Sequence, residues 1–117
     1  MKYLDILQNK INLSTEDFVL VKEEALKVFE KLEEKNVQFS EETFEITFCN
    51  HIASLIKRVI EKELVEELPE EFMNETSEKA KEISTYLVKD IFEKYDVELN
   101  KTEVFLVSTH IELTLMN

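Results

Sequence analysis

The sequence predicts an all-α fold, a compact bundle of five main helices with or without a short extra N-terminal helix. Glycine is absent from the 117 residues, and proline occurs once, at Pro69. Tight β-turns usually need residues with positive φ, which glycine supplies, so this composition disfavours an all-β fold. Apolar residues also recur at the spacing of an amphipathic helix. A chain of this length is most simply one domain. We place it at residues 14–117, with residues 1–13 as an N-terminal extension or short helix.

The first helix of the domain is expected over residues 14–35. Ser14 is a suitable N-cap, and Glu16 and Asp17 in the first turn favour the positive end of the helix dipole. Asn36 follows as the residue that ends the helix. The apolar face of this helix consists of Phe18, Val21, Ala25, Val28, Phe29 and Leu32.

The second helix is expected from Ser40 to about Glu63, and it is the most apolar one. Its apolar side chains cover an arc of roughly 200° on a helical wheel. A helix with so wide an apolar face is expected at the centre of the fold, with neighbours on several sides. These side chains are Phe44, Ile46, Phe48, Cys49, Ile52, Ala53, Leu55, Ile56, Val59 and Ile60.

Three further helices complete the predicted bundle. A short one is expected over residues 68–73, with Pro69 at its first position, where the missing N–H is not needed. A long helix should begin at Thr76 or Ser77 and end near residue 96. The last helix should follow Asn100-Lys101-Thr102-Glu103, a capping box of the Asn-x-x-Glu form, and run to the C-terminus.

The charge of the chain excludes some classes of partner. There are 26 acidic and 14 basic residues, which gives a formal net charge of −12. A nucleic-acid-binding protein needs a cationic surface to displace counterions, so we expect no direct contact with DNA or RNA and none with an anionic membrane.

No segment approaches roughly 18 consecutive apolar residues, and no signal peptide is recognisable. Cys49 is the single cysteine and cannot form an internal disulfide. We therefore expect a cytoplasmic protein.

The two histidines of the chain are the strongest candidates for chemistry. His51 and His110 are each followed by Ile within an apolar helical run. Histidine accepts protons, metals or phosphoryl groups near neutral pH. Each could instead be an ordinary half-buried helix residue, but two in matching settings weaken that interpretation. A metal site is disfavoured because no His-x-x-x-His pair exists and Cys49 lies on the far side of the helix from His51. We expect no metal and no cofactor.

Arg58 and Ser54 lie on the same side of the second helix as His51. Arg58 is within about 20° of His51 on the wheel. A guanidinium can form paired hydrogen bonds with a phosphate or a carboxylate, so Arg58 is either a phosphate ligand or a cation paired with an acidic residue. Ser54 is one turn from both and could add a donor. Glu103 is explained by its capping role, and we expect no direct contact with His110, about 10 Å along the helix axis.

Three segments, taken in order, resemble a known family, the PTS regulation domain (PRD). The segment from Asn50 to Arg58 is similar to its first histidine motif, typically Asp-His-Ile or Asp-His-Leu with an Arg seven residues after the His. Residues 69–72, Pro-Glu-Glu-Phe, are similar to its Tyr-Pro-x-x-Tyr/Phe element, with Leu in place of the first Tyr. The segment from Glu103 to His110 resembles the second motif, in which a Glu opens the final helix. The resemblance covers about residues 15–117.

The resemblance implies a five-helix domain that commonly dimerises. It also implies that His51 and His110 are phosphorylated by the phosphocarrier HPr or by an EIIB component of the bacterial sugar phosphotransferase system. Arg58 would stabilise or read the phosphate, with Ser54, Asn50 and Glu103 in support. Regulators of this family usually carry two such domains and an effector domain. In this sequence we expect one such domain and no effector domain. We therefore expect a stand-alone, non-enzymatic homodimer that modulates a separate transcriptional regulator through protein contacts.

Three alternatives remain open at this stage. Asn50 stands where the family often has Asp, which leaves a non-phosphorylated dimerisation or interaction module with the same fold as the main alternative. A histidine phosphotransfer domain of a two-component relay is also a helical bundle, but it normally presents one exposed His near a Lys and a Gly. A metal-dependent hydrolase is disfavoured by the absence of a ligand cluster.

Overall fold

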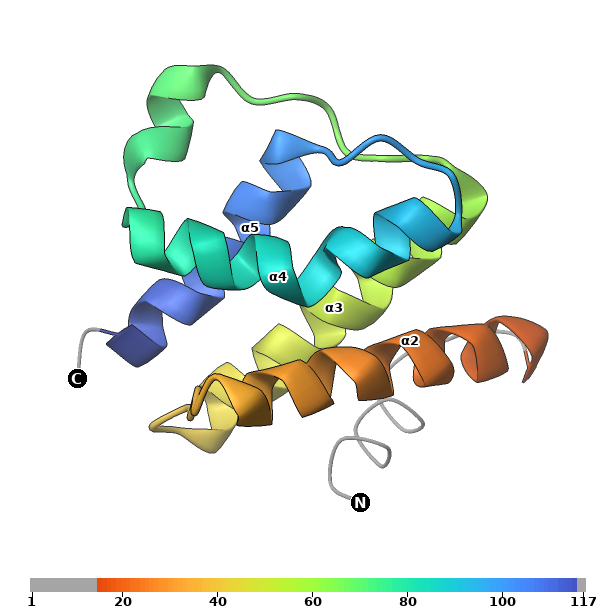
Figure 1. The fold of residues 1–117 in the computed structure, drawn as a ribbon, viewed down its shortest axis with the longest axis horizontal. Helices are drawn as coiled ribbons and strands as arrows, with labels where there is room; N and C mark the ends of the chain where they lie inside the picture. The colour runs from red at the N-terminus through yellow and green to blue at the C-terminus, as the bar shows by residue number, and fades with distance from the viewer. Residues whose placement is uncertain (1–14, 116–117) are drawn as a thin grey trace.

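The structure, a computed structural model, describes residues 15–115, with side chains from residue 19 onward, and every helix in it is joined to the next by a short connection or loop (Figure 1). The α-helices are α2 (Thr15–Glu34), α3 (Glu42–Glu61), α4 (Glu78–Lys94) and α5 (Lys101–Leu115). A 3-10 helix, η1 (Glu70–Asn74), lies between α3 and α4. No strand occurs in this part of the chain. The all-α prediction is therefore confirmed.

The prediction of five main helices is wrong, because the described residues form four α-helices and the single short turn of η1. A backbone hydrogen bond from Phe72 N to Pro69 O, at 3.0 Å, closes the first turn of η1. No residue of η1 is buried, and Phe72 is 51% exposed. Because η1 buries little of its apolar surface, the segment gains too little from packing to extend into an α-helix. The optional helix in residues 1–13 and the Ser14 cap lie outside the described residues.

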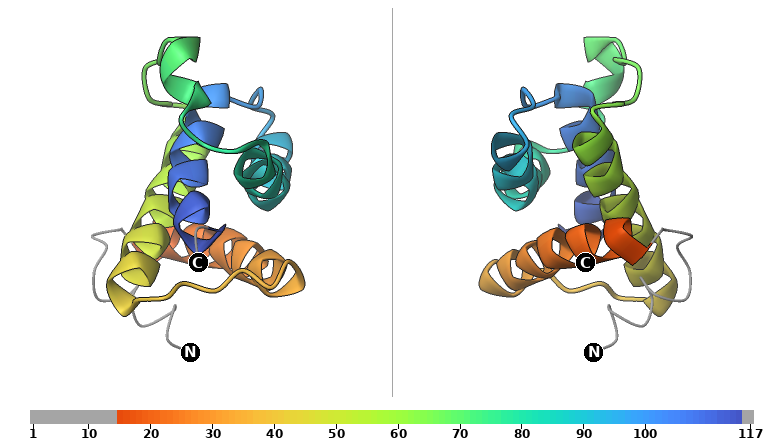
Figure 2. Two further views of the ribbon diagram at one scale, coloured as in Figure 1. Left: turned by 90° about the vertical axis from the view of Figure 1, so that its left-hand side faces the viewer. Right: turned by 90° about the vertical axis from the view of Figure 1, so that its right-hand side faces the viewer.

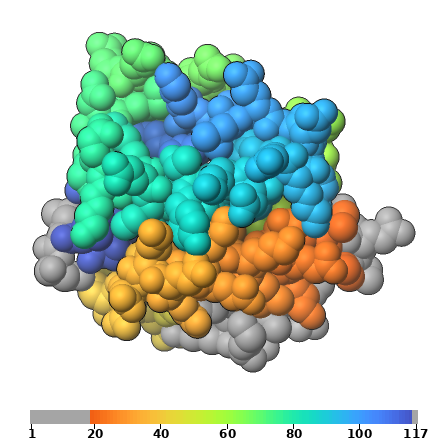
Figure 3. All heavy atoms as spheres, in the orientation of Figure 1, coloured from red at the N-terminus to blue at the C-terminus, as the bar shows by residue number. Residues whose placement is uncertain are grey.

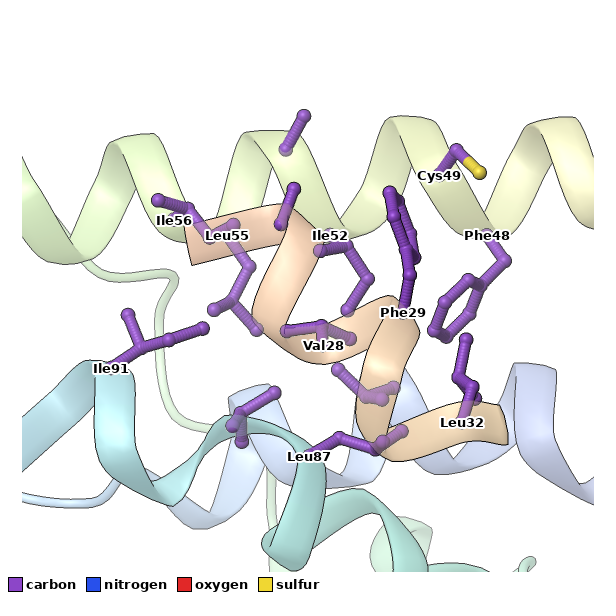
Figure 4. Packing of buried hydrophobic residues seen from close by; sticks show 14 of the residues in the cluster. Val28, Phe29, Leu32, Phe48, Cys49, Ile52, Leu55, Ile56, Leu87 and Ile91 are labelled. Atoms are coloured by element: carbon purple, nitrogen blue, oxygen red, sulfur yellow. The ribbon is translucent and has the colours of Figure 1, made fainter. Parts of the chain in front are cut away.

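Helix α3 has neighbours on several sides, as the width of its apolar face predicted. It packs against α2, α4 and α5. Figure 2 shows α3 and α5 running side by side, with α4 to one side of them and α2 across their ends. Side chains from α2, α3 and α4 meet in the core shown in Figure 4. The core members labelled there are Val28, Phe29, Leu32, Phe48, Cys49, Ile52, Leu55, Ile56, Leu87 and Ile91.

Three helices end at non-glycine residues in the left-handed region. Asn36, Lys62 and Asp96 have φ values of 55°, 59° and 55°. After each one the chain turns back and closes a six-residue hydrogen bond, for example from Val97 N to Phe92 O at 2.9 Å. Asn and Asp tolerate this conformation because their short polar side chains can bond locally. The glycine-free chain therefore still ends its helices abruptly, which fixes where α3 stops and the following loop begins.

Polar contacts join the outer edges of α2 and α4, which lie next to each other on the face shown in Figure 3. Lys31 Nζ donates to Asp90 Oδ2 at 2.7 Å and to the backbone carbonyl of Tyr86 at 2.9 Å. Lys94 Nζ donates at 2.6 Å to a carboxylate oxygen of Glu24, whose side chain is buried. These links hold α2 against α4 over the core.

Candidate functional site

The two histidines meet where α3 and α5 run side by side. His51 Nδ1 and His110 Nε2 are 2.9 Å apart and share a hydrogen bond, across 59 residues of sequence. The ring centroids are 4.9 Å apart, and the ring planes are inclined at 73°. Both side chains are half-buried. The sequence predicted the two residues individually, and the structure brings them into one pair.

Burial holds both imidazoles in the neutral form. Burial first, and then the neighbouring charges of His110 and Arg58, together lower the pKa of His51 from 6.5 to about 4, against a smaller opposing effect of Glu103. Burial also lowers the pKa of His110. A neutral imidazole has one N–H and one nitrogen with a lone pair. In the shared hydrogen bond one ring donates and the other accepts, so each ring keeps one outward nitrogen for other chemistry.

An aromatic wall stands beside the pair. The edge of the Phe48 ring meets the His110 ring, with centroids 6.0 Å apart and planes at 77°. Phe48 is fully buried and also contacts Phe39, with centroids 5.0 Å apart. Because Phe48 cannot move without opening the core, it limits the positions open to the His110 ring. From the sequence, Phe48 was expected only in the core, although its place one turn before His51 was a usable signal.

Arg58 forms a two-point ion pair with Glu103. Its Nε and Nη2 donate to Glu103 Oε2 and Oε1, both at 2.8 Å. The Glu103 side chain is fully buried and that of Arg58 is 25% exposed. A buried carboxylate requires such partners, and the fork of the guanidinium matches its two oxygens. Of the two interpretations of Arg58, pairing with an acidic residue is the one that the structure shows.

The capping prediction for Glu103 is half right. Asn100 Oδ1 accepts from the Glu103 backbone N–H at 3.0 Å, which is the first half of a capping box. The Glu103 side chain, however, points to Arg58 instead of returning to the Asn100 backbone. It also receives a longer contact from Val65 N at 3.5 Å. Glu103 therefore links α3, α5 and the loop that follows α3.

Arg58 still has donors to offer a ligand. A guanidinium carries five N–H groups, and Glu103 occupies Nε–H and one of those on Nη2. The positive charge of Arg58 is near enough to lower the pKa of His51. The histidine pair thus lies in the field of a cation that Glu103 holds in place.

The two remaining predicted residues flank the pair without bonding to it. Ser54 is exposed, and no hydrogen bond in the described part of the chain connects it with either histidine. Asn50 Oδ1 is buried and, among described residues, has no hydrogen-bond partner. The roles predicted for Ser54 and Asn50 stay predictions.

Side chains of α5 also fasten the loop between α3 and α4, which sequence analysis did not foresee. Thr102 Oγ1 accepts from Leu68 N at 3.0 Å. The hydroxyls of Thr76 and Ser108 are 2.8 Å apart and both are buried. Glu112 accepts from the Ser77 hydroxyl at 2.7 Å. Thr102 and Ser108 are small polar residues on the otherwise apolar last helix. Their presence there was the sequence signal that could have indicated these contacts.

Residues 15–115 contain no group of three or more His, Cys, Asp or Glu side chains placed to hold a metal ion. None of their helices is long and apolar enough to cross a membrane.

Comparison with known proteins places the chain in a family. The family model described as PRD domain matches residues 23–114, a segment that includes both histidines, Arg58 and Glu103. Neither the curated proteins nor the solved structures gave a match. Because the family match spans most of the chain, the chain belongs to the PRD domain family, whose members are regulatory modules of the phosphotransferase system.

Proposed function

We propose that this protein is a non-enzymatic regulatory module that accepts a phosphoryl group on His51 or His110. The observation that carries the proposal is the pair itself, two neutral imidazoles joined at 2.9 Å in a chain that matches the PRD domain family. The donor is HPr or an EIIB protein of the phosphotransferase system, and the acceptor needs neither metal nor cofactor.

The neutral state of the pair suits it to this reaction. A ring nitrogen must present its lone pair to phosphorus, and a protonated imidazole has none to offer. The lowered pKa values of His51 and His110 keep that lone pair available across the physiological pH range. The charge of Arg58, which already acts on His51, would attract the phosphoryl group, and guanidinium groups commonly bind phosphate.

The consequence of phosphorylation is electrostatic. A phosphoryl group adds about −1.5 to −2 charges at pH 7. The group arrives between α3 and α5 in a chain whose net charge is already −12. The added repulsion favours looser packing across any interface that covers the His51–His110 pair, such as a homodimer interface. The output is a change in protein contacts with a separate transcriptional regulator in the cytoplasm, because so acidic a chain is poorly suited to bind nucleic acid directly.

The test is phosphorylation by enzyme I, HPr and phosphoenolpyruvate, followed by intact-mass analysis under non-acidic conditions. Wild type should gain a phosphoryl mass that is lost on acid treatment. The double variant His51→Ala/His110→Ala should gain none, and Ser40→Ala, at an exposed position outside the site, is the control that keeps both rings. A gain that persists in the double variant would place the acceptor elsewhere and refute the proposal.

One observation favours a second candidate, a PRD fold used only as an interaction module. The pair already satisfies its own hydrogen bond, and Asn50 replaces the Asp that often precedes the first histidine in the family. An Asp carboxylate at position 50 would favour the charged form of the neighbouring imidazole, whereas the amide of Asn50 does not. If neither HPr nor a panel of EIIB proteins transfers a phosphoryl group, while the protein still dimerises, the interaction module is the better account.

A further inference from the structure

We infer that His110 is the proton acceptor for the phosphorylation of His51, so that the arriving phosphoryl group reverses the hydrogen bond between the two rings. The inference rests on the proposed function and deepens it by giving the two histidines different tasks. It follows from which nitrogens face each other. His51 contributes Nδ1 and His110 contributes Nε2 to the 2.9 Å contact, so the outward nitrogens are His51 Nε2 and His110 Nδ1.

Of the two rings, His51 has the better surroundings for a phosphate. After burial and His110, Arg58 is the next cause of the lowered pKa of His51, whereas for His110 the cause is burial. The guanidinium charge that acts on His51 also attracts a phosphoryl group. Arg58 keeps N–H groups beyond the two that Glu103 occupies. His51 is therefore the ring to which we assign the phosphoryl group.

The tautomer that attacks sets the direction of the shared bond before the reaction. The attacking lone pair belongs to the outward Nε2, so the proton of neutral His51 is on Nδ1. That N–H donates to His110 Nε2 across 2.9 Å. Because His110 Nε2 accepts, the proton of neutral His110 is on its outward Nδ1.

The transfer itself leaves a proton that must be moved. As His51 Nε2 bonds to phosphorus, the bond from phosphorus to the donor atom breaks, and the donor atom leaves with the bonding electrons. The His51 ring, now substituted on Nε2 and still protonated on Nδ1, is a cation. Burial, then His110 and Arg58, lower the pKa of His51 against the smaller effect of Glu103, so a cation at this position is unfavourable. Arg58 can balance the phosphoryl charge in its place.

His110 gives this proton a way out. The proton on His51 Nδ1 passes along the shared bond to His110 Nε2, and His110 releases the proton of its outward Nδ1 to water. A departing donor nitrogen takes up one proton, so the count balances. His51 ends as a neutral phosphorylated ring whose Nδ1 accepts from the His110 Nε2–H. The bond between the rings is kept, and its donor and acceptor have exchanged roles.

The packing around the pair favours this route over others. On its core side, His110 meets the ring of Phe48, which is fully buried and has no atom that accepts a proton. Arg58 already carries a positive charge. His110 is only half-buried, so water can take a proton from the outward side of its ring.

The first test measures how fast His51 is phosphorylated. Wild type and His110→Gln are incubated with phosphoramidate, a small donor that needs no docking, and in parallel with enzyme I, HPr and phosphoenolpyruvate. The Gln carbonyl can accept a hydrogen bond from His51 Nδ1 but cannot take its proton. Thr109→Ala, at an exposed position beside His110, is the control that keeps both rings. Circular dichroism verifies the fold of each variant.

We expect peptide mapping to find the phosphoryl group on His51 in wild type. His110→Gln should take it up about 10²-fold more slowly from both donors, the usual effect of losing a positioned proton acceptor. Thr109→Ala should match wild type. Equal rates in wild type and His110→Gln, or a group found on His110 and not on His51, would overturn the inference and leave the proposed function intact. Absence of uptake by wild type from both donors would overturn the two together.

Imidazole ¹⁵N spectra of phosphorylated wild type at pH 7 give a reading that a merely structural role of His110 would not produce. His51 Nδ1 should have the shift of a nitrogen with a lone pair, and His110 should carry its proton on Nε2, the nitrogen that faces His51. A proton retained on His51 Nδ1 would overturn the inference even if His110→Gln reacted slowly.

Discussion

Arg58 and Glu103, 45 residues apart, are joined by two hydrogen bonds of 2.8 Å, and the Glu103 side chain is completely buried. This pair fixes the end of α3 against the start of α5. It therefore sets the relation between the two helices that carry His51 and His110. The same carboxylate contacts the loop after α3 through Val65 N, at 3.5 Å. Glu103 thus acts on the histidine pair through the position of its helix and of Arg58.

Removal of Arg58 should destabilise the fold. Arg58→Met leaves a buried carboxylate without its main partner, and breaking such a pair costs about 3 kcal/mol in the free energy of unfolding. Urea denaturation of wild type and Arg58→Met measures this difference in the free energy of unfolding. Lys57→Ala is the matched control, since Lys57 and Glu61 form an exposed pair at 3.9 Å, worth at most about 1 kcal/mol. The double variant Arg58→Met/Glu103→Leu should recover most of the loss. Equal effects of Arg58→Met and Lys57→Ala would show that the buried pair contributes little.

The two halves of the ion pair should move the pKa of His51 in opposite directions. The charge of Arg58 lowers that pKa and the charge of Glu103 raises it. Arg58→Met should therefore raise the pKa of His51, and Glu103→Gln should lower it further. NMR titration of the imidazole carbon-bound protons measures both. A merely structural role for the pair would loosen the site in either variant and shift the pKa in the same direction, toward 6.5.

Acidification should weaken the fold through His51. Its pKa is about 4 in the folded protein and 6.5 in the unfolded chain, so the unfolded chain binds the extra proton first. The contribution of His51 to stability is thus complete above pH 6.5, declines as the pH falls toward 4, and then levels off. The loss is up to about 3 kcal/mol.

The control for this pH dependence is His51→Gln, which lacks the titrating group but keeps a polar side chain. Chemical denaturation at several pH values between 4 and 7 should give a steeper decline for wild type than for the variant. Parallel declines would mean that His51 takes up its proton as readily in the folded state as in the unfolded one.

Two serines that look alike in sequence should differ as helix caps. Ser77 accepts from Ala80 N at 3.2 Å and donates to Glu112 at 2.7 Å, and this contact lowers the pKa of Glu112. Ser40 was predicted to begin α3, but the structure begins that helix at Glu42, with Glu41 in the cap position and no side-chain cap bond. Ser77→Ala should cost about 1 kcal/mol in thermal or urea unfolding. Ser40→Ala should cost less than about 0.5 kcal/mol, and a reversed order would contradict the assignment of the caps.

Local signals in the sequence predicted most of the secondary structure. The apolar spacing placed the cores of α2, α3, α4 and α5, and the breadth of the apolar face predicted that α3 has neighbours on several sides. Residues that favour the left-handed conformation marked helix ends, as at Asn36. The segment of η1 was predicted to be helical from Pro69, but that signal says how a helix starts and not how far it continues. Its length depended on burial, which the sequence pattern did not reveal.

By itself, then, the sequence determined the fold class, the helix that has neighbours on several sides and the histidines that merit attention. Only the tertiary structure decided that His51 bonds to His110 and that Arg58 binds Glu103. Periodicity reports which face of a helix is buried, whereas contacts between residues 59 or 45 positions apart depend on how α3 and α5 align over a shared core. Glu103 illustrates the difference, because its side chain left a neighbouring backbone N–H for a guanidinium that offers two charge-assisted hydrogen bonds.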